Sequence, residues 1–235
     1  MNADTNNKKT ETVAVDLSNM RATYTAQTLD DINDAALLNP LALFATWLDE
    51  AKQDVHEANA MTLSTVGPDG KPSSRVVLLK AFDDHGFVLY TNYNSRKSAH
   101  LAANGHAALT FYWKERQVRI EGHATRTSTQ ESDAYFATRP RASQIGAWVS
   151  SAQSSPVGSR AALLEIEQEL EHKFAQTEKI PRPEFWGGWR VSCDYIEFWQ
   201  GRVGRLHDRL VFTPSGPDAG SEKSLSGWTV TRLMP

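Results

Sequence analysis

A succession of short strand-like runs, which begins at Met61, constrains the fold of this chain more than any other feature. β-Branched and apolar residues dominate each run, and turn signals rich in Gly, Asp or Pro separate the runs. We expect three of them to form an antiparallel meander: MTLSTV, SSRVVLLKAF and FVLYTN. A hairpin around Lys114 and Glu115 is predicted from HAALTFYW and RQVRIEGHATR. The C-terminal part returns to strand-like runs: WRVSCDYIEFWQG, RLHDRLVFTP and GWTVTRLMP.

Helical signals occur between these runs without alternating with them one by one. Asn39 followed by Pro40 is typical of a helix start, and apolar residues at helical spacing continue that helix to about residue 58. Further helices are predicted over 95–103, around TQESDAYFATR and around SRAALLEIEQELEHKFAQ. This order favours a mainly β (α+β) fold, an antiparallel barrel with peripheral helices, over a doubly wound parallel sheet. The sequence also lacks GxGxxG, GxxxxGK[ST] and HExxH motifs.

The ends of the chain differ from this body. Residues 1–20 are polar and aperiodic, which predicts a flexible tail, and residues 21–235 are expected to form a single domain with an exposed loop at 214–227. No window approaches about 18 uninterrupted apolar residues, and the first residues lack the apolar stretch of a signal peptide. We therefore expect a cytoplasmic protein without a membrane partner. Cys193 is the single cysteine, which excludes an internal disulfide and a CxxC metal site, and we expect no bound metal.

Charge is distributed unevenly along the chain. The formal net charge is −3, which argues against a nucleic-acid partner. Residues 61–150 nevertheless carry 11 Lys or Arg against 7 Asp or Glu, whereas residues 1–60 carry 4 against 10. Either the basic excess is spread over solvated faces, or it serves a site for a small anion such as a phosphate.

The segment that opens with Ser95 offers one such site at a helix N-terminus. A capping hydroxyl, free backbone N–H groups and the cations Arg96 and Lys97 together suit a phosphate. Cations are otherwise unfavourable at the positive end of a helix dipole, although plain solvated charges remain the alternative. Arg75 and Lys80, five positions apart on a predicted strand, are expected on opposite faces, where they reach solvent or serve two different ligands.

A second cationic group gathers where a predicted helix runs into Pro140. Tyr135, Arg139, Arg141 and Ser143 offer a phenol, two guanidiniums and a hydroxyl within one turn and the following loop. Arginine matches phosphate oxygens with a planar fork, so this group suits a phosphate. The alternative is a helix C-terminus that cations stabilise.

A third group lies in RLHDR. On a strand, Arg205, His207 and Arg209 would share one face, and Asp208 on the opposite face would hold neighbouring structure. A histidine flanked by two arginines is biased toward its neutral form and could hydrogen-bond a substrate hydroxyl or phenolate. Most of the tryptophans are expected to be core residues.

Taken together, these and neighbouring motifs resemble the pyridoxamine 5'-phosphate oxidase family. The motifs are RVVLLK at 75–80, YTNYNSRK at 90–97, RPRASQIGAWVS at 139–150, FWGGWRV at 185–191, and IEFWQG followed by RLHDR. The resemblance covers roughly residues 20–213 in the same order, and RPRASQIGAW with RLHDR is its most specific part. It implies an FMN-binding split β-barrel that forms a homodimer with FMN at the subunit interface.

The resemblance also implies roles for individual residues. The implied FMN contacts are Arg75, Val76, Val77, Leu78, Leu79, Lys80, Tyr90, Thr91, Arg96, Lys97, Gln117, Gln153, Ser154, Trp199 and Arg209. The implied substrate contacts are Arg21, Tyr24, Lys80, Tyr135, Arg139, Ser143, Arg205, Leu206 and His207. Within that set, Lys80, Tyr135, Arg139 and Ser143 correspond to a phosphate clamp. Arg205 and His207 correspond to the catalytic pair that holds the pyridine ring over the flavin, and Arg21 and Tyr24 to a segment that closes over it.

The implied reaction is the FMN-dependent oxidation of pyridoxamine or pyridoxine 5'-phosphate to pyridoxal 5'-phosphate. A hydride passes to flavin N5, O₂ then reoxidises the flavin to give hydrogen peroxide, and the amine substrate also releases ammonia. Because the flavin supplies the redox chemistry, the protein's tasks are orientation and charge placement. Two other functions remain open: a non-catalytic binder of FMN or pyridoxal phosphate, and a flavin reductase that uses a nicotinamide. The Arg205 and His207 pair argues against the first, and the phosphate clamp argues against the second.

Overall fold

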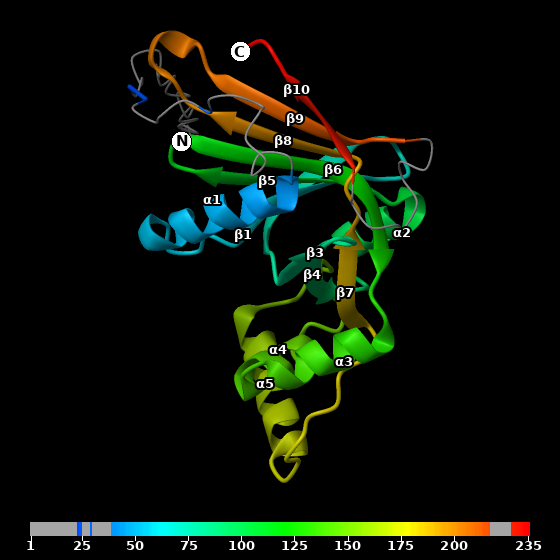
Figure 1. The fold of residues 1–235 in the computed structure, drawn as a ribbon. Helices are drawn as coiled ribbons and strands as arrows, with labels where there is room; N and C mark the ends of the chain where they lie inside the picture. Colours follow the sequence, from blue (N-terminus) through cyan, green and yellow to red (C-terminus); the bar gives the residue numbers. More distant parts are fainter. Residues whose placement is uncertain (1–22, 25–28, 30–38, 217–226) are drawn as a thin grey trace, which may run out of the picture.

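The computed structural model describes residues 23–24, 29, 39–216 and 227–235, and shows a mainly β molecule (Figure 1). The strands in this described part are β1 Ala60–Val66, β2 Pro72–Leu78, β3 Ala81–Asp83, β4 Gly86–Asn92, β5 His106–Trp113, β6 Arg116–Arg126, β7 Trp186–Val191, β8 Tyr195–Gln200, β9 Asp208–Pro214 and β10 Trp228–Arg232. The helices are α1 Pro40–Asp54, α2 Arg96–Asn104, α3 Thr129–Thr138, α4 Arg141–Val149 and α5 Arg160–Phe174, with a short 3-10 helix, η2, at Val203–Arg205. The predicted tail, residues 1–20, and most of the predicted loop 214–227 lie outside the described residues.

The strands form one curled antiparallel sheet with a branch. The main path runs β10-β9-β8-β6-β5-β1-β2, and β3, β4 and β7 form a smaller layer that rejoins β6. β6 belongs to both layers, because its residues 116–121 pair with β8 and residues 124–126 pair with β7. Between these stretches, a Cβ atom on Gly122 would lie 1.6 Å from the carbonyl oxygen of Ser192. Glycine therefore permits the close approach at which the sheet curls into a half-barrel.

The predicted three-stranded meander is wrong in its third member. β1 and β2 form the expected hairpin and β3 pairs with β4, but the second neighbour of β1 is β5 and that of β4 is β7. The chain changes layer at Leu79 and Lys80, whose N–H groups donate to the carbonyl oxygens of Asn59 and Val88. The apolar run VVLL continues across this change of layer, so its sequence reads as one strand. The predicted hairpin of β5 and β6 is confirmed.

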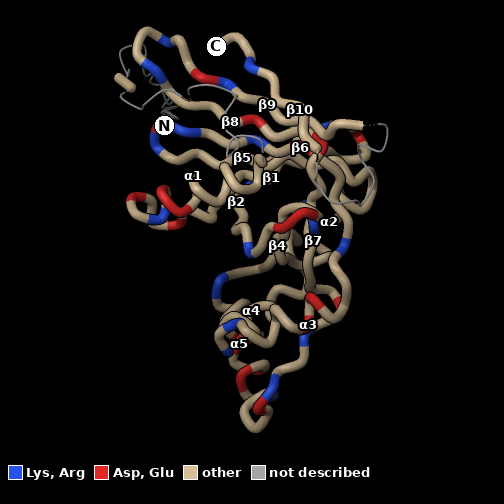
Figure 2. The backbone as a smooth tube through the Cα atoms, viewed as in Figure 1, with Lys and Arg blue, Asp and Glu red and all other residues tan. Residues whose placement is uncertain are grey.

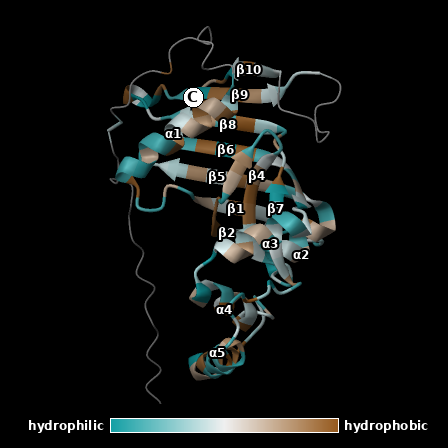
Figure 3. Ribbon diagram, turned by 60° about the horizontal axis from the view of Figure 1, so that its bottom comes forward, coloured by the Kyte–Doolittle hydropathy of each residue, from teal (hydrophilic) through white to brown (hydrophobic). Residues whose placement is uncertain are grey.

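Helix α1 covers one face of the large sheet and closes the main core (Figure 3). Asn39 caps it by accepting from the N–H groups of Leu41 and Ala42, and Pro40 occupies the first helical turn as predicted. Phe44 is fully buried among aromatic rings of three strands. The helix ends at Asp54, earlier than residue 58, because the next residue adopts extended backbone angles.

Helices α3, α4 and α5 pack into a second core cluster at the other end of the molecule, below β4 and β7 in Figure 1. A capping box of Ser128 and Glu131 starts α3. A loop is predicted after Pro140, but the structure has helix α4 there, starting at Arg141. The fixed φ of proline suits the start of a helix, which explains why the chain turns directly from α3 into α4.

Charged residues are distributed over both ends of the described part of the molecule. Both signs of charge occur on the large sheet and at the helical end (Figure 2). Among the described residues, no helix combines the length and apolar character needed to cross a membrane. Cys193 is buried, as expected, and burial raises the pKa of its thiol.

Candidate active site

A cavity of about 510 Å³ opens between the end of β2, strand β4 and the junction of α3 with α4. Its lining contains nine of the predicted site residues: Val77, Leu78, Lys80, Tyr90, Thr91, Tyr135, Arg139, Ser143 and Gln153. Asn92, Thr138, Pro140 and Trp186 complete the lining. The structure thus brings the predicted phosphate clamp together with part of the predicted cofactor contacts.

Arg139 is a cation of this cavity with a buried nitrogen that lacks a hydrogen-bond acceptor within the described part of the chain. It follows the last residue of α3 in extended conformation, and its Nη1 is buried without a hydrogen-bond partner among the described residues. Burial lowers the pKa of the guanidinium. A buried cation without a partner is costly, and an anion that accepts from Nη1 would remove that cost. Arg141, in contrast, donates to the carbonyl oxygens of Phe174 and Thr177 and stabilises the helical end.

Aromatic rings form one wall of the cavity. Tyr90 and Tyr135 stack with their centroids 4.0 Å apart, and Trp186 lies nearly parallel to both. The Arg139 guanidinium lies over the Trp186 ring, 4.6 Å from its centroid. Sequence reasoning missed Trp186 as a cavity residue. Gly188, two residues after Trp186, also belongs to this wall, since a Cβ there would lie 2.9 Å from the Tyr90 ring.

The N-terminus of α2 forms a second cationic group beside the cavity. Ser95 caps α2 as predicted. Lys97 donates to Thr91 Oγ1 at 3.0 Å and to Gln153 Oε1 at 2.9 Å, and burial followed by the positive charge of Arg75 lowers its pKa. The backbone N–H of Arg96 donates to Ser154 Oγ. These residues therefore gather around an N-terminus that suits an anion.

The predicted cofactor residues of β2 divide between two faces of the strand. Arg75 does not simply reach solvent, because its guanidinium donates to Leu63 O, Thr65 Oγ1 and Ser73 Oγ. Burial and the charge of Arg96 lower its pKa. Val76 points to the opposite face and is 68% exposed, whereas Leu79 is buried in the main core. Neither side chain lines the cavity.

A separate group of predicted residues lies on the large sheet. Gln117, Trp199 and Arg209 are cross-strand neighbours on β6, β8 and β9. Arg209 donates to Glu197 Oε1 at 2.8 Å and to the carbonyl oxygen of Met234. Burial raises the pKa of Glu197, but hydrogen bonds from Arg209 and Tyr195 outweigh burial and leave that pKa lowered.

Arg205 and His207 do not lie on a strand, which corrects the expectation of one shared face with Arg209. β9 begins at Asp208, and the preceding residues form η2 and its exit. Gly204 and Arg205 both have positive φ, 70° and 63°, so the chain turns there instead of extending. Leu206 is 74% exposed.

His207 instead packs against aromatic rings. Its ring centroid lies 4.7 Å from that of Trp199 and 5.5 Å from that of Tyr24, and its Nδ1 accepts from the backbone N–H of Arg202. Asp208 accepts from Leu29 N–H and Arg232, in line with its predicted structural role. Arg21 lies outside the described residues.

The two groups of predicted residues lie far apart within one chain. β8 and β9, which flank η2, are at the top of Figure 1, whereas β4 lies in the middle and α3 and α4 lie at the bottom. Neither Arg205 nor His207 lines the cavity between β4, α3 and α4. The structure therefore assembles the phosphate clamp and the predicted catalytic pair in different places. Among the described residues, no cluster of three or more His, Cys, Asp or Glu side chains could hold a metal ion.

Comparisons with known proteins match most of this chain. Residues 48–172 match the family model described as pyridoxamine 5'-phosphate oxidase. Residues 186–235 match the model of the pyridoxine 5'-phosphate oxidase C-terminal dimerisation region. A pyridoxine/pyridoxamine 5'-phosphate oxidase of Rubrobacter xylanophilus is 52% identical over 94% of this chain and 97% of its own length. One from Burkholderia vietnamiensis is 49% identical over 93% and 99%.

Solved structures show the same fold. PhzG of Burkholderia lata, crystallised with tetrahydrophenazine-1-carboxylic acid, is 31% identical, with a TM-score of 0.75 over 84% of this chain and 93% of its own. A pyridoxamine 5'-phosphate oxidase-related, FMN-binding protein of Nostoc punctiforme shares the fold at 14% identity, with a TM-score of 0.64 over 84% of this chain and 99% of its own. The fold is that of the FMN-binding split-barrel proteins, as the sequence motifs predict. The chain belongs to the pyridoxamine 5'-phosphate oxidase family.

Proposed function

We propose that this protein is a homodimeric, cytoplasmic, FMN-dependent oxidase. It converts pyridoxamine or pyridoxine 5'-phosphate to pyridoxal 5'-phosphate with O₂ as electron acceptor, and releases hydrogen peroxide, with ammonia from the amine. The observation that carries the proposal is the buried, unpartnered Nη1 of Arg139 in a cavity that Lys80, Tyr135 and Ser143 also line. Together these groups offer the planar donor fork, point charge and hydroxyls that a phosphate monoester accepts.

The residues around α2 fit the phosphate of FMN. Besides burial, the charge of Arg96 helps to lower the pKa of Arg75, and the charge of Arg75 helps to lower that of Lys97, so these three cations lie close together at the N-terminus of α2. Thr91, Gln153 and Ser154 add polar atoms beside them. FMN, when bound, supplies the hydride acceptor of the reaction.

The task of the protein is to orient the substrate. The clamp of Lys80, Tyr135, Arg139 and Ser143 fixes the phosphate and excludes water from it. Arg205 and His207 hold the pyridine ring so that its reacting carbon faces the flavin. His207 Nδ1 accepts from a backbone N–H, so a neutral ring carries its proton on Nε2, from which it donates to a ring substituent.

Two chains are needed to complete this site. Neither Arg205 nor His207 lines the cavity of the clamp in its own chain, so in this proposal the pair that meets a given clamp comes from the second subunit. The match of residues 186–235 to a dimerisation region supports this arrangement, because those residues include η2 and β9. Gln117, Trp199 and Arg209 then approach the flavin of the partner chain.

Anaerobic mixing tests the proposal. FMN-loaded protein is mixed with pyridoxine 5'-phosphate and, separately, pyridoxamine 5'-phosphate, and flavin absorbance is followed before and after air is admitted. We expect bleaching, followed by pyridoxal 5'-phosphate and hydrogen peroxide when O₂ enters. Bound flavin that neither substrate bleaches would contradict the oxidase. Bleaching by NADH alone would then assign a reductase, and no bleaching by any of the three a non-catalytic binder.

A further inference from the structure

We propose that Arg182 is a positioning residue for phosphate binding, because it fixes Trp186, the ring on which the Arg139 guanidinium rests. Arg182 lies outside the cavity and outside every motif that indicated the site. The inference rests on the proposed function and deepens it, since it names the residue that sets the geometry of the phosphate clamp.

Aromatic rings fix the position of Arg139. Its guanidinium carbon lies 4.6 Å from the centroid of Trp186 and 5.6 Å from that of Phe136, and Nη1 has no polar partner among the described residues. A guanidinium held by a ring face keeps its in-plane N–H groups free to donate. The direction of Nη1 therefore depends on where the Trp186 ring lies.

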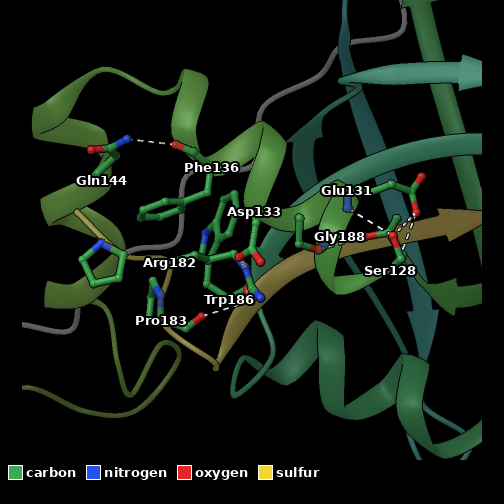
Figure 4. Close-up of polar contacts among 12 residues, drawn as sticks. Ser128, Glu131, Asp133, Phe136, Gln144, Arg182, Pro183, Trp186 and Gly188 are labelled. Atoms are coloured by element: carbon green, nitrogen blue, oxygen red, sulfur yellow. Dashed lines mark hydrogen bonds and ion pairs between the residues drawn. The ribbon is translucent and has the colours of Figure 1, made fainter. Parts of the chain in front are cut away.

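Arg182 holds the backbone of Trp186 (Figure 4). Its Nη1 donates to the carbonyl oxygen of Trp186 at 2.6 Å and to that of Pro183 at 3.3 Å. Its Nε donates to Asp133 Oδ1 at 2.6 Å, which ties this turn to α3. The Arg182 side chain is only 11% exposed, and its hydrogen bonds to the two backbone carbonyl oxygens are partly buried.

This turn carries Trp186, one of the three stacked rings of the aromatic wall. Trp186 lies within 12° of the plane of Tyr90 and 5° of that of Tyr135, and both tyrosines line the cavity. A small displacement of the Trp186 carbonyl would tilt its ring away from this stack and move the Arg139 fork with it. Hydrogen-bond strength falls steeply with misalignment, so such a displacement weakens phosphate binding without removing any clamp residue.

Arg190 provides a matched control for a purely structural role. It too is a half-buried arginine that ties α3 to β7, through Glu131 at 2.9 Å, and it also pairs with Asp83. Neither of its ion-pair partners lines the cavity. If Arg182 only attached α3 to the rest of the molecule, Arg182→Met and Arg190→Met would have the same consequences for ligands.

The experiment compares ligands with and without a phosphate. FMN-loaded wild type, Arg182→Met and Arg190→Met are titrated calorimetrically with pyridoxal 5'-phosphate, pyridoxal and inorganic phosphate. We expect Arg182→Met to lower the affinities for pyridoxal 5'-phosphate and inorganic phosphate about tenfold each. The affinities for pyridoxal and FMN should change less than about twofold. We expect less than about a twofold change for every ligand in Arg190→Met. Arg182→Lys, which keeps a cation toward Asp133, should recover part of the loss.

Equal weakening of pyridoxal 5'-phosphate and pyridoxal in Arg182→Met, or equal effects in both methionine variants, would overturn the inference. If Arg182→Met does not fold, Trp186→Phe and Trp186→Leu are titrated in its place. Weaker phosphate binding in the leucine variant alone supports the role of the ring. The proposed function would be refuted if wild type binds inorganic phosphate but not pyridoxal 5'-phosphate, and if neither pyridoxine 5'-phosphate nor pyridoxamine 5'-phosphate bleaches its flavin. The affinities of wild type, Arg182→Met and Arg190→Met for inorganic phosphate would still test the role of Arg182.

Discussion

The cavity beside α3 and α4 and the sheet surface around Trp199 differ in how their arginines are partnered. In the cavity, Arg139 has a buried nitrogen without an acceptor. On the sheet, Arg209 donates to Glu197, which is 2% exposed, and to the carbonyl oxygen of Met234. A buried cation without a partner favours an anion from solution, whereas a satisfied cation is already held in place. This difference agrees with the proposal that the cavity captures a phosphate, whereas the sheet surface presents an ordered set of side chains.

This difference explains how one site can be divided between two chains. In the proposed function the phosphate meets the clamp residues of a single chain, since all four line the same cavity. The ring-orienting residues can then come from a partner chain, provided that their own chain holds them rigidly. The packing of His207 against Trp199 and Tyr24 meets that condition.

The largest expected effect follows from Arg139→Met. Loss of the charge-assisted hydrogen bonds should raise the KM for pyridoxine 5'-phosphate roughly 100-fold, since bonds to charged groups contribute about 1.5–3 kcal/mol. Thermal stability should stay the same or rise, because the variant removes a buried cation without a partner. Steady-state kinetics and calorimetry check both, and a clear loss of stability would show that Arg139 is structural.

Glu197→Gln tests the other region. The carboxylate bridges Arg119 and Arg209 and accepts from Tyr195, so its loss should cost about 2 kcal/mol of unfolding free energy. That figure allows for the partial exposure of both arginines. Urea unfolding of the FMN-loaded dimer measures it. Unchanged stability would mean that Glu197 does not fix the position of Arg209 before ligands bind.

His207→Ala should lower kcat about tenfold and leave FMN bound, because the ring orients the substrate and has no place among the predicted flavin contacts. Arg205→Ala should act in the same direction. Flavin fluorescence after gel filtration reports cofactor retention. Loss of flavin from both variants would make these residues cofactor ligands instead.

Ser143→Ala removes one neutral donor from the clamp. We expect a three- to fivefold rise in KM for the phosphorylated substrate, in keeping with about 1 kcal/mol for a hydrogen bond. The KM for unphosphorylated pyridoxine should not change. An equal change for both substrates would place Ser143 away from the phosphate.

The smallest expected effect concerns acid stability. The lowered pKa of Glu197 gives a contribution to stability that is present above the ordinary carboxyl pKa of about 4.3 and is lost as the pH falls through the lower folded value. The stability difference between wild type and Glu197→Gln should therefore shrink as the pH falls below about 4. Unfolding curves at several acidic pH values check this, and a constant difference would contradict the assignment.

The sequence predicted the residues of the cavity better than the shape around it. Lys80, Tyr135, Arg139 and Ser143 come from different elements, yet motif resemblance grouped them correctly. The resemblance did not indicate that α4 follows Pro140 directly: a loop is predicted there, whereas the structure has a helix from Arg141 to Val149. The role of Trp186 was also hidden, since a tryptophan in a strand-like motif is usually a core residue.

Around RLHDR the local pattern was misleading. Alternation of charged and other residues predicted a strand, but the positive φ of Gly204 and Arg205 breaks it before Asp208. His207, which follows this turn, packs on Trp199, a long-range contact that the local sequence pattern does not indicate. Likewise, no local signal in RVVLLKAF marks the point where the chain leaves one sheet layer for the other.

The central claim is that the clamp of one chain and the Arg205–His207 pair of another form one site, and subunit complementation tests it most directly. Arg139→Met and His207→Ala chains carrying different affinity tags are coexpressed, and the heterodimer is purified and assayed at low substrate concentration. The account predicts about half the wild-type kcat/KM, because one of the two sites then contains neither substitution. A heterodimer no more active than the better of the two mutant homodimers would contradict it.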